Sequence, residues 1–185
     1  MIRELKNELN LLIDKSIFSP DINILQDEDW SRIIEEFQFD YHRYYSDLLD
    51  FSKIKYFPGL LATFFYRISR YLYLNGDEKN AQEFSSLGFS NTMIELYYSA
   101  EIGRALKINH GMGTVVGSRT RLGDNVLLHH GVTIGEKNGG RANIGNNVIV
   151  YPGAIIVGDI LIGNNSVVGA NVFVDKSYPV NSKIM

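Results

Sequence analysis

The sequence predicts an α+β protein in which an N-terminal α-helical domain, residues 1–95, is followed by a left-handed parallel β-helix, residues 96–185. Two observations predict this division. Apolar residues in the first half recur at steps of three and four, which is the spacing of one helix face. In the second half they recur every six residues and are often followed by glycine, which is the pattern of hexapeptide repeats.

Three helical segments are expected in the first half. The apolar face of the first is formed by Ile2, Leu5, Leu9 and Leu12. The second is predicted to start at an Asp27 cap, and its apolar side is formed by Trp30, Ile33, Ile34 and Phe37. The third should begin at Pro58, which suits a first helical turn, and stop at Asn75-Gly76.

The hexapeptide repeats share an apolar first position. These positions are Leu96, Ile102, Ile108, Val116, Leu122, Leu128, Ile134, Ile144, Val150, Ile156, Ile162, Val168, Val174 and Val180. Three repeats make one triangular coil, and each first-position side chain points inward onto its equivalent in the next coil, about 4.8 Å away. Corners need left-handed backbone that Gly and Asn tolerate, so we expect corners at residues 124–125, 146–147 and 164–165.

Two longer steps interrupt the repeats. The step from Ile108 to Val116 is eight residues, which predicts a two-residue bulge at residues 111–113. The step from Ile134 to Ile144 is ten residues, which predicts an extruded loop at residues 136–141. Insertions in a solenoid often form loops on its binding face, so this loop is expected to cover a site.

Composition excludes several classes of function. The chain has 185 residues and a net charge of −3, and its Lys and Arg are scattered, so no basic patch for nucleic acid or an anionic membrane is present. It has no cysteine, which excludes disulfides, thiolate metal ligands and a cysteine nucleophile. The charged N-terminus is unlike a secretory signal, and the apolar run at residues 60–66 is too short to span a membrane. We therefore expect a cytoplasmic protein.

Three histidines lie in the repeat half. His110 and His130 occupy the same position in repeats that are three apart, so they should stack about 4.8 Å apart along one edge, with His129 beside them. One of the stacked pair could act as a general base, or both could be edge residues without a catalytic role, and the spacing leaves both interpretations open. No third ligand accompanies them, so we expect no metal.

Residues 95–113 and 131–135 resemble the signature of the serine acetyltransferases, and residues 56–59 and 66–68 resemble an upstream motif of that family. The family run Asp-His-(Gly/Ala)-Thr-Gly is matched here by Asn-His-Gly-Met-Gly at residues 109–113, with the same bulge. The likeness covers about residues 56–180 and supports the β-helix prediction.

The resemblance implies transfer of an acetyl group from acetyl-CoA to an acceptor hydroxyl in a ternary complex. The family's catalytic histidine corresponds to His110, and its partner carboxylate, fifteen residues earlier, corresponds to Glu95. Acceptor-binding positions correspond to Asn109, His130 and Arg141. The acetyl-CoA groove would lie between neighbouring β-helices of a homotrimer, either alone or in a dimer of trimers, at the positions Gly135, Tyr151 and Ala170.

The chain departs from the family at its acceptor site. Asn109 replaces an aspartate, and Arg-Ala-Asn at residues 141–143 replaces Arg-His-Pro. These changes predict a less acidic acceptor site than the family has. Three functions remain open: a serine or related amino-acid O-acetyltransferase, which the resemblance favours, an O-acetyltransferase acting on a sugar or another hydroxylated metabolite, and a non-catalytic hexapeptide scaffold.

Overall fold

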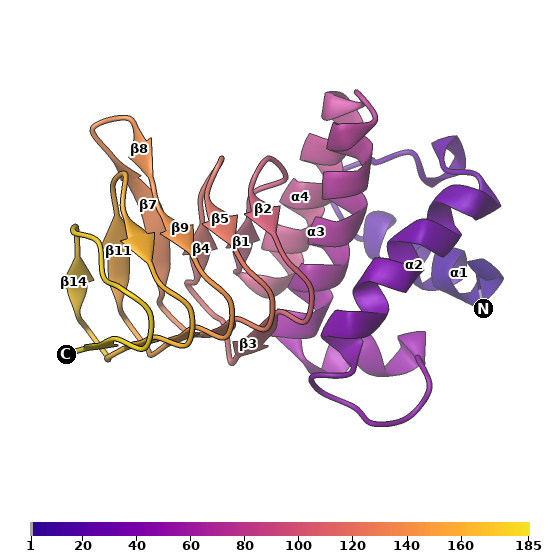
Figure 1. Ribbon diagram of the computed structural model, residues 1–185. Helices are drawn as coiled ribbons and strands as arrows, with labels where there is room; N and C mark the ends of the chain where they lie inside the picture. The colour runs from indigo at the N-terminus through magenta and orange to yellow at the C-terminus, as the bar shows by residue number, and fades with distance from the viewer. Residues whose placement is uncertain (1) are drawn as a thin grey trace.

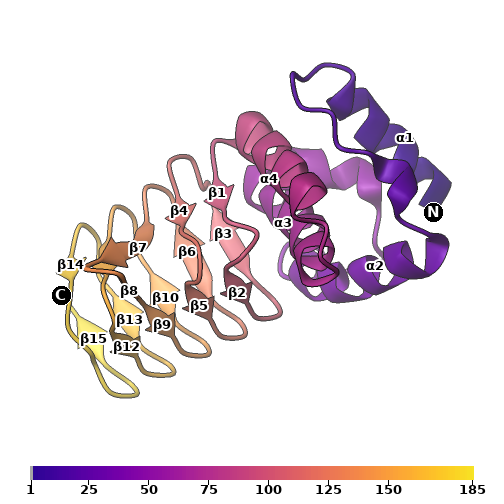
Figure 2. The same ribbon diagram turned by 90° about the horizontal axis from the view of Figure 1, so that it is seen from above.

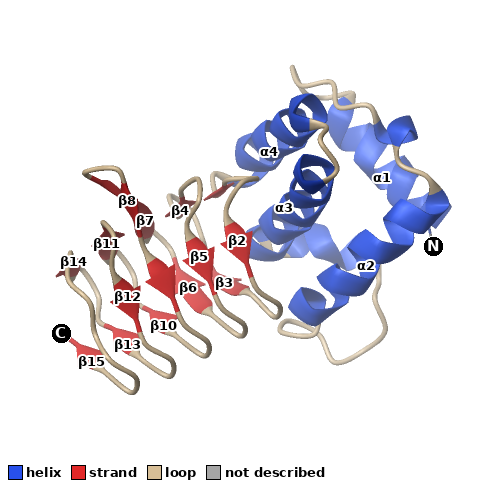
Figure 3. Ribbon diagram, turned by 45° about the horizontal axis from the view of Figure 1, so that its top comes forward, coloured by secondary structure: helices blue, strands red, loops and turns tan. Residues whose placement is uncertain are grey.

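The computed structural model describes residues 2–185, and it places a group of helices at one end of a parallel β-helix (Figure 1). The helices are α1 (Ile2–Ile13), α2 (Asp27–Tyr41), α3 (Pro58–Leu74) and α4 (Glu78–Thr92), with short 3-10 turns η1 (Ile22–Ile24) and η2 (Phe51–Tyr56). Figure 3 shows the helices gathered together, with the strands stacked away from them. None of the helices within residues 2–185 has the length and apolar content needed to cross a bilayer.

The predicted helix faces are confirmed. The core of the helical region includes Leu5 and Leu9 of α1 together with the apolar residues predicted for α2. Pro58 begins α3 and Asn75 caps its end, as expected. The predicted cap of α2 is wrong by one residue, because Gln26 is the N-cap and its N–H donates to Asp29 Oδ2 at 2.8 Å. A capping box thus replaces the single Asp cap.

Fifteen short strands form the second half. Their bounds are β1 (Glu95–Leu96), β2 (Glu101–Ile102), β3 (Lys107–Asn109), β4 (Val115–Val116), β5 (Arg121–Leu122), β6 (Leu127–His129), β7 (Thr133–Lys137), β8 (Gly140–Arg141), β9 (Asn143–Ile144), β10 (Ile149–Val150), β11 (Ile155–Val157), β12 (Leu161–Ile162), β13 (Val167–Val168), β14 (Phe173–Val174) and β15 (Lys183–Ile184). They make three parallel faces: face 1 is β1-β4-β7-β11-β14, face 2 is β2-β5-β9-β12, and face 3 is β3-β6-β10-β13-β15. Figure 2 shows successive coils side by side. The prediction of helices followed by a parallel β-helix is confirmed.

The predicted inward stack is confirmed except at its end. Val180 is 57% exposed, so the prediction that it points inward is wrong. Tyr178 pairs with Ile162 instead, and Ile184 pairs with Val168. The step from Val174 to Tyr178 is four residues rather than six, so the last coil is shortened and its register shifts.

The predicted asparagine corners are present. Asn125, Asn147 and Asn165 have φ of 59°, 57° and 59°. The Asn125 side-chain amide donates to Asn147 Oδ1 at 2.7 Å, and Asn147 donates to Asn165 Oδ1 at 3.0 Å. One residue type therefore supplies both the left-handed turn and a ladder of side-chain hydrogen bonds between coils.

Both predicted insertions leave the coil. The bulge follows β3 and contains the left-handed residues Gly111 and Gly113, with φ of 73° and 74°. The loop at residues 136–141 is a hairpin in which β8 pairs antiparallel with the end of β7 (Figure 1). Its turn residues Asn138 and Gly139 both have positive φ, as a tight two-residue hairpin turn requires.

The open edge of the first coil is covered by side chains of the helical region. Tyr66 in α3 accepts a hydrogen bond from the Ile102 N–H at 3.0 Å and donates to the Ala100 carbonyl at 2.8 Å. Tyr44, which follows α2, accepts from the Ile108 N–H at 2.8 Å and donates to its carbonyl at 2.9 Å. These hydroxyls satisfy backbone groups that a further strand would otherwise pair.

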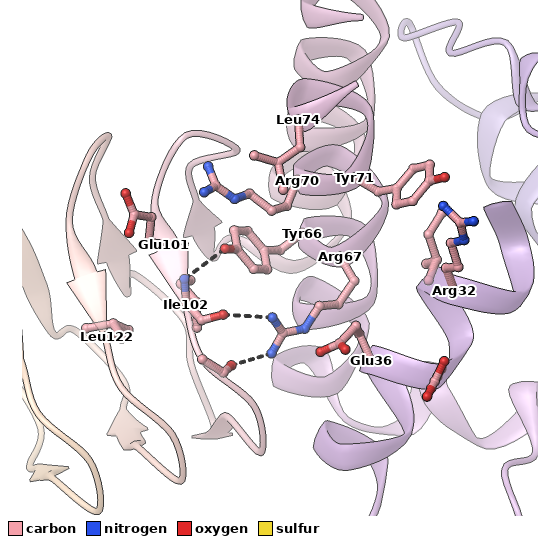
Figure 4. A pocket seen from close by; sticks show the side chains of 13 residues that line it. Arg32, Glu36, Tyr66, Arg67, Arg70, Tyr71, Leu74, Glu101, Ile102 and Leu122 are labelled. Carbon is pink, nitrogen blue, oxygen red and sulfur yellow. Dashed lines mark hydrogen bonds between the residues drawn. The ribbon is translucent and has the colours of Figure 1, made fainter. Parts of the chain in front are cut away.

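A buried ion pair joins the same two regions. Arg67 donates to both oxygens of Asp40, at 2.8 and 3.0 Å. It also donates to the carbonyls of Ile102 and Gly103, at 2.8 and 2.6 Å (Figure 4). Asp40 also accepts from the Leu106 N–H at 2.8 Å. Burial raises the pKa of Asp40, and the positive charge of Arg67 opposes that rise. The pair fixes α2 and α3 onto the first coil.

Candidate active site

His110 lies at the corner between faces 3 and 1, directly after β3. Its φ is +63°, and the Gly111 N–H donates to the Asn109 carbonyl across it at 2.8 Å. This is the hydrogen bond of a γ-turn, and a positive φ there is uncommon for a residue with a side chain. Gly111 cannot be replaced without strain, because a Cβ there would lie 2.3 Å from Ile94 Cδ1. The bulge therefore holds an exposed histidine in a restricted backbone conformation, as functional sites often do.

The predicted neighbour relation between His110 and His130 is confirmed. Strands β3 and β6 are paired so that Ile108 lies opposite Leu128, which brings the two corner histidines together. Their ring centroids are 6.1 Å apart and the rings meet edge to face at 73°. Two ionisable rings are thus available on one edge.

His129 makes specific contacts that its position next to His130 in the sequence did not predict. It lies opposite Asn109 in the strand register, its Nδ1 lies 3.0 Å from the Val150 carbonyl, and its ring stacks on Tyr151 at 5.1 Å and 11°. The carbonyl requires the proton on Nδ1, which leaves Nε2 to accept from the Asn109 amide at 3.5 Å. Asn109, His129 and Tyr151 each follow an inward-facing repeat residue by one position. This spacing in the sequence could have identified them as neighbours on the outside of the coil.

A cavity of about 440 Å³ lies between the helical region and β3 at this corner. Its lining consists of Tyr44, Tyr56, Phe57, Pro58, Gly59, Lys107, Ile108, Asn109 and His110. Lys107 Nζ lies 5.1 Å from the centre of the Tyr44 ring. Burial raises the pKa of Tyr44, so its hydroxyl stays neutral and bonded to the strand. Sequence reasoning noted residues 56–59 as a motif but missed Lys107, which lies on β3 itself, and Tyr44, which the packing of the helical region on β3 brings to this corner.

Glu95 lies in β1, opposite Val115 of β4, and is half-buried. Across residues 2–185 no hydrogen bond or ion pair joins Glu95 to His110. The pairing of these two residues therefore stays a prediction.

Arg141 lies at the other edge of face 1, away from His110. Its Nε donates to the Ser118 carbonyl at 2.8 Å, and its Nη1 pairs with Glu136 Oε2 at 2.8 Å. The hydrogen bond from Arg141 lowers the pKa of Glu136. Arg141 lines a second cavity, of about 460 Å³, together with Arg119, Arg121 and Asn143 among others. Within one chain, the predicted base His110 and the predicted acceptor-binding Arg141 therefore lie in separate cavities.

The positions predicted to bind acetyl-CoA are also divided between the two edges of face 1. Ala170 follows Val168 by two residues, as His130 follows Leu128, so it shares the histidine corner. Tyr151 lies beside that corner, stacked on His129. Gly135 pairs with Val157 at the far end of face 1, near the hairpin.

A larger cavity, of about 640 Å³, lies between α2, α3 and the first coils (Figure 4). It is lined by Tyr66 and Arg67, whose polar atoms are bonded to the first coil, and it contains no histidine. We therefore assign the candidate site to the cavity at His110. Within the described residues 2–185, no group of three His, Cys, Asp or Glu is arranged to hold a metal ion.

Comparison with known proteins agrees with this architecture. The family described as bacterial transferase hexapeptide (six repeats) matches residues 141–176. A serine acetyltransferase of Helicobacter pylori (strain ATCC 700392 / 26695) is 38% identical over 130 residues, which is 68% of this chain and 76% of that protein. The chain belongs to the serine acetyltransferase family. Members of this family are acyltransferases.

Other members of the serine acetyltransferase family are similar over a comparable span. One from Staphylococcus epidermidis (strain ATCC 12228 / FDA PCI 1200) is 39% identical over 127 residues, covering 66% of this chain and 60% of that protein. The solved serine acetyltransferase of Neisseria gonorrhoeae in complex with serine has a TM-score of 0.73 and 28% identity, covering 82% of this chain and 66% of that one. Isoform 3 from Entamoeba histolytica, in complex with cysteine, has a TM-score of 0.77 and 26% identity, covering 85% and 59%. The chain is thus shorter than these two solved relatives.

Proposed function

We propose that the protein transfers the acetyl group of acetyl-CoA to the hydroxyl of serine or a closely related acceptor, with His110 as the general base. The observation that carries the proposal is the placement of His110, which is exposed on a constrained bulge and lines a cavity. Membership of the serine acetyltransferase family supports the choice of donor and acceptor. Because acetyl-CoA is a cytosolic metabolite, we also propose a cytoplasmic location.

In this mechanism His110 removes the proton from the acceptor hydroxyl as its oxygen attacks the thioester carbonyl carbon. The carbon–sulfur bond then breaks, and the proton passes from His110 to the departing CoA thiolate, so the products are an acetyl ester and free CoA. A hydroxyl is a poor nucleophile at neutral pH, which is why a general base contributes about 10²–10⁴ in rate. Glu95 would orient His110 and stabilise the imidazolium.

We further propose that the active site is completed by a second copy of the chain in a homotrimer. His110 and Arg141 lie at opposite edges of face 1, in separate cavities. A threefold ring places one edge of each copy against the other edge of its neighbour, which would bring the two residues together. The outer side of face 1 also exposes Ile155 and Phe173, apolar side chains that such packing would cover.

In the trimer, Asn109 and His130 would contact the acceptor from the histidine edge, and Arg141 would contact it from the neighbouring copy. Acetyl-CoA would lie in the groove between copies, along Tyr151 and Ala170 of one chain and Gly135 of the next. Each of these positions borders the edge to which it is assigned.

Complementation between subunits tests this proposal. His110→Ala and Arg141→Ala should each be nearly inactive alone, with CoA release as the measure. When the two variants are co-expressed in equal amounts, random trimers should recover about a quarter of wild-type activity, because one interface in four pairs an intact His110 with an intact Arg141. Absence of recovery, or a monomer mass in light scattering, would show that the site is not shared. A wild-type chain that releases no CoA with any acceptor would favour the scaffold alternative.

A further inference from the structure

We propose that Arg119 of one copy binds the carboxylate of the amino-acid acceptor that His110 of the neighbouring copy deprotonates. This inference rests on the proposed acetyl transfer in a homotrimer, and it names a further binding residue for the same shared site. It comes from the backbone conformation of Arg119, its level along the β-helix and its unpaired charge.

The backbone conformation of Arg119 is unusual for a long side chain. Within residues 96–185, the left-handed residues other than glycine are six asparagines together with Ala105, His110 and Arg119. Asparagine tolerates this conformation, whereas most residues with a Cβ disfavour it, and such backbone is concentrated at functional sites. The two left-handed corners with ionisable side chains are thus His110, the proposed base, and Arg119, whose φ is +62°.

Arg119 and His110 lie at the same level of the β-helix. His110 comes just before β4, and Arg119 follows β4 at the corner between faces 1 and 2. A threefold axis parallel to the β-helix keeps every residue at its own level, so the edge with Arg119 meets the neighbour's edge at the level of His110. His130 and Arg141 flank β7 in the same way, one coil further on. Each histidine of one copy should therefore face one arginine of the next.

Arg119 and Arg141 line the same cavity, and Arg119 brings the unpaired charge. Arg141 reaches back to the Ser118 carbonyl, beside Arg119, but Glu136 balances its charge. Within residues 2–185 the exposed Arg119 side chain makes no hydrogen bond or ion pair. Its guanidinium group is therefore free to bind a carboxylate through two parallel N–H donors.

The other charged side chains of this cavity do not cancel that charge. Glu101 is paired with Arg121 at 3.2 Å. Asp159 lies at the equivalent corner two coils beyond Arg119, since β5 and β12 both pair with β9. Two strand spacings separate the backbones of these corners by about 10 Å, and the two side chains form no ion pair. Arg70, which donates to a backbone carbonyl at 3.3 Å, adds to the positive charge.

A carboxylate held by Arg119 would orient the acceptor for His110. In serine the carboxylate and the hydroxyl are attached to adjacent carbon atoms, so fixing one of them directs the other. Holding a reactant in the right geometry is itself a large part of catalysis. Arg119 would thus contribute acceptor binding and orientation, while His110 removes the proton.

Steady-state kinetics with acetyl-CoA as donor test the inference. CoA release is measured with L-serine and with L-serinamide, in which a neutral amide replaces the carboxylate. Wild-type protein should use L-serinamide about 10- to 100-fold less well in kcat/KM, the size of a charge-assisted hydrogen bond. Arg119→Asn, which suits the left-handed corner, should lower kcat/KM for L-serine by a similar factor and leave L-serinamide and the KM for acetyl-CoA unchanged.

Two further variants sharpen this test. Arg119→Lys should retain part of the activity with L-serine, because lysine keeps the charge but not the planar fork of donors. Arg104→Asn is the matched control, since it removes an exposed arginine that pairs with Glu36 away from face 1. It should change none of these constants.

Mixing subunits tests whether Arg119 acts on the neighbouring copy. His110→Ala and Arg119→Asn are co-expressed in equal amounts and assayed at L-serine concentrations below the wild-type KM. One interface in four then pairs an intact His110 with an intact Arg119, so about a quarter of the wild-type rate should return. No recovery above the rate of Arg119→Asn alone would overturn the proposal.

The remaining outcomes separate this inference from the proposed function. If Arg119→Asn affects L-serine and L-serinamide equally, or affects neither, Arg119 does not bind the carboxylate, while acetyl transfer stands. If the variant raises the KM for acetyl-CoA instead, Arg119 binds a phosphate of the donor and the inference is wrong. If wild-type protein releases no CoA with either acceptor, the proposed acetyl transfer fails together with this inference.

Discussion

The helical region and the β-helix satisfy their backbone polar groups in different ways. Within the β-helix each strand pairs with the equivalent strand of the next coil, so one rule repeats along the axis. The first coil has no preceding strand, and its backbone is instead paired by side chains of the helical region, chiefly Tyr44, Tyr66 and Arg67. Regular strand pairing tolerates many sequences. The joint between the helical region and the first coil depends instead on a few individual side chains.

The joint should therefore be the most sensitive part of the molecule. Asp40→Asn removes the charge that balances Arg67, whose side chain is 8% exposed. Breaking a buried ion pair by removing one partner costs about 3–5 kcal/mol of the free energy of unfolding. Urea unfolding measures this loss. Glu36→Gln, which removes an exposed partner of Arg104, is the matched control and should change the midpoint little. Equal effects of the two variants would contradict the special role of the joint.

A steric change at the joint should have the next largest effect. A Cβ on Gly59 of α3 would lie 2.3 Å from the Ile108 carbonyl oxygen and 2.9 Å from the Tyr44 hydroxyl. Gly59→Ala should destabilise the protein by about 1–3 kcal/mol, since neither backbone can move freely. In Gly135→Ala the nearest atom is 3.7 Å away, so that variant should unfold at nearly the wild-type denaturant concentration. If Gly59→Ala matched that control, α3 would not be tightly seated on β3.

Within the repeats, a single corner should matter less. Asn147→Ala removes two side-chain hydrogen bonds and places alanine at a φ of 57°. We expect a loss of about 1–2 kcal/mol. Asn147→Gly keeps the backbone freedom, so thermal unfolding should show a smaller loss for it than for alanine. Because both variants lose the ladder, equal losses would mean that the side-chain ladder, not the left-handed corner, dominates.

The hairpin should contribute least to stability. Lys137 Nζ lies 2.6 Å from Asp175, and this contact lowers the pKa of Asp175. A lowered carboxyl pKa stabilises the fold above the unfolded pKa, and that contribution is lost as pH falls through the folded pKa. Both groups are exposed, so Lys137→Ala should reduce the thermal midpoint only slightly at pH 7, and the difference from wild type should vanish in acid. A difference that persists in acid would point to packing rather than charge.

Most of the β-helix could be predicted because six-residue spacing sets both the inward side chains and the corners. The prediction failed at Val180, where a shortened step moves Tyr178 and Ile184 into the inward positions. A six-residue pattern cannot reveal this shortened step, because an apolar residue, Val180, still lies six residues after the preceding repeat position, Val174. Helix faces were predictable for the same periodic reason, but the contacts of Arg67 with Asp40 were not.

The candidate site could be predicted only in part. The stacking of His110 and His130 follows from counting repeats, because equivalent corners of adjacent coils must be neighbours. The cavity could not be foreseen, since Tyr44 and Lys107 are brought together by the docking of helices on strands, which has no sequence period. The separation of His110 from Arg141 likewise depends on which edge of face 1 each one occupies.

The measurement that tests the account most directly is the turnover of His110→Ala. The exposed ring lies on the surface of the bulge, so the variant should keep wild-type secondary structure, assembly and acetyl-CoA binding. Its kcat for CoA release should fall by about 10²–10⁴, the size of a general-base contribution. Near-wild-type turnover by a folded His110→Ala protein would contradict the central claim that this corner performs the chemistry.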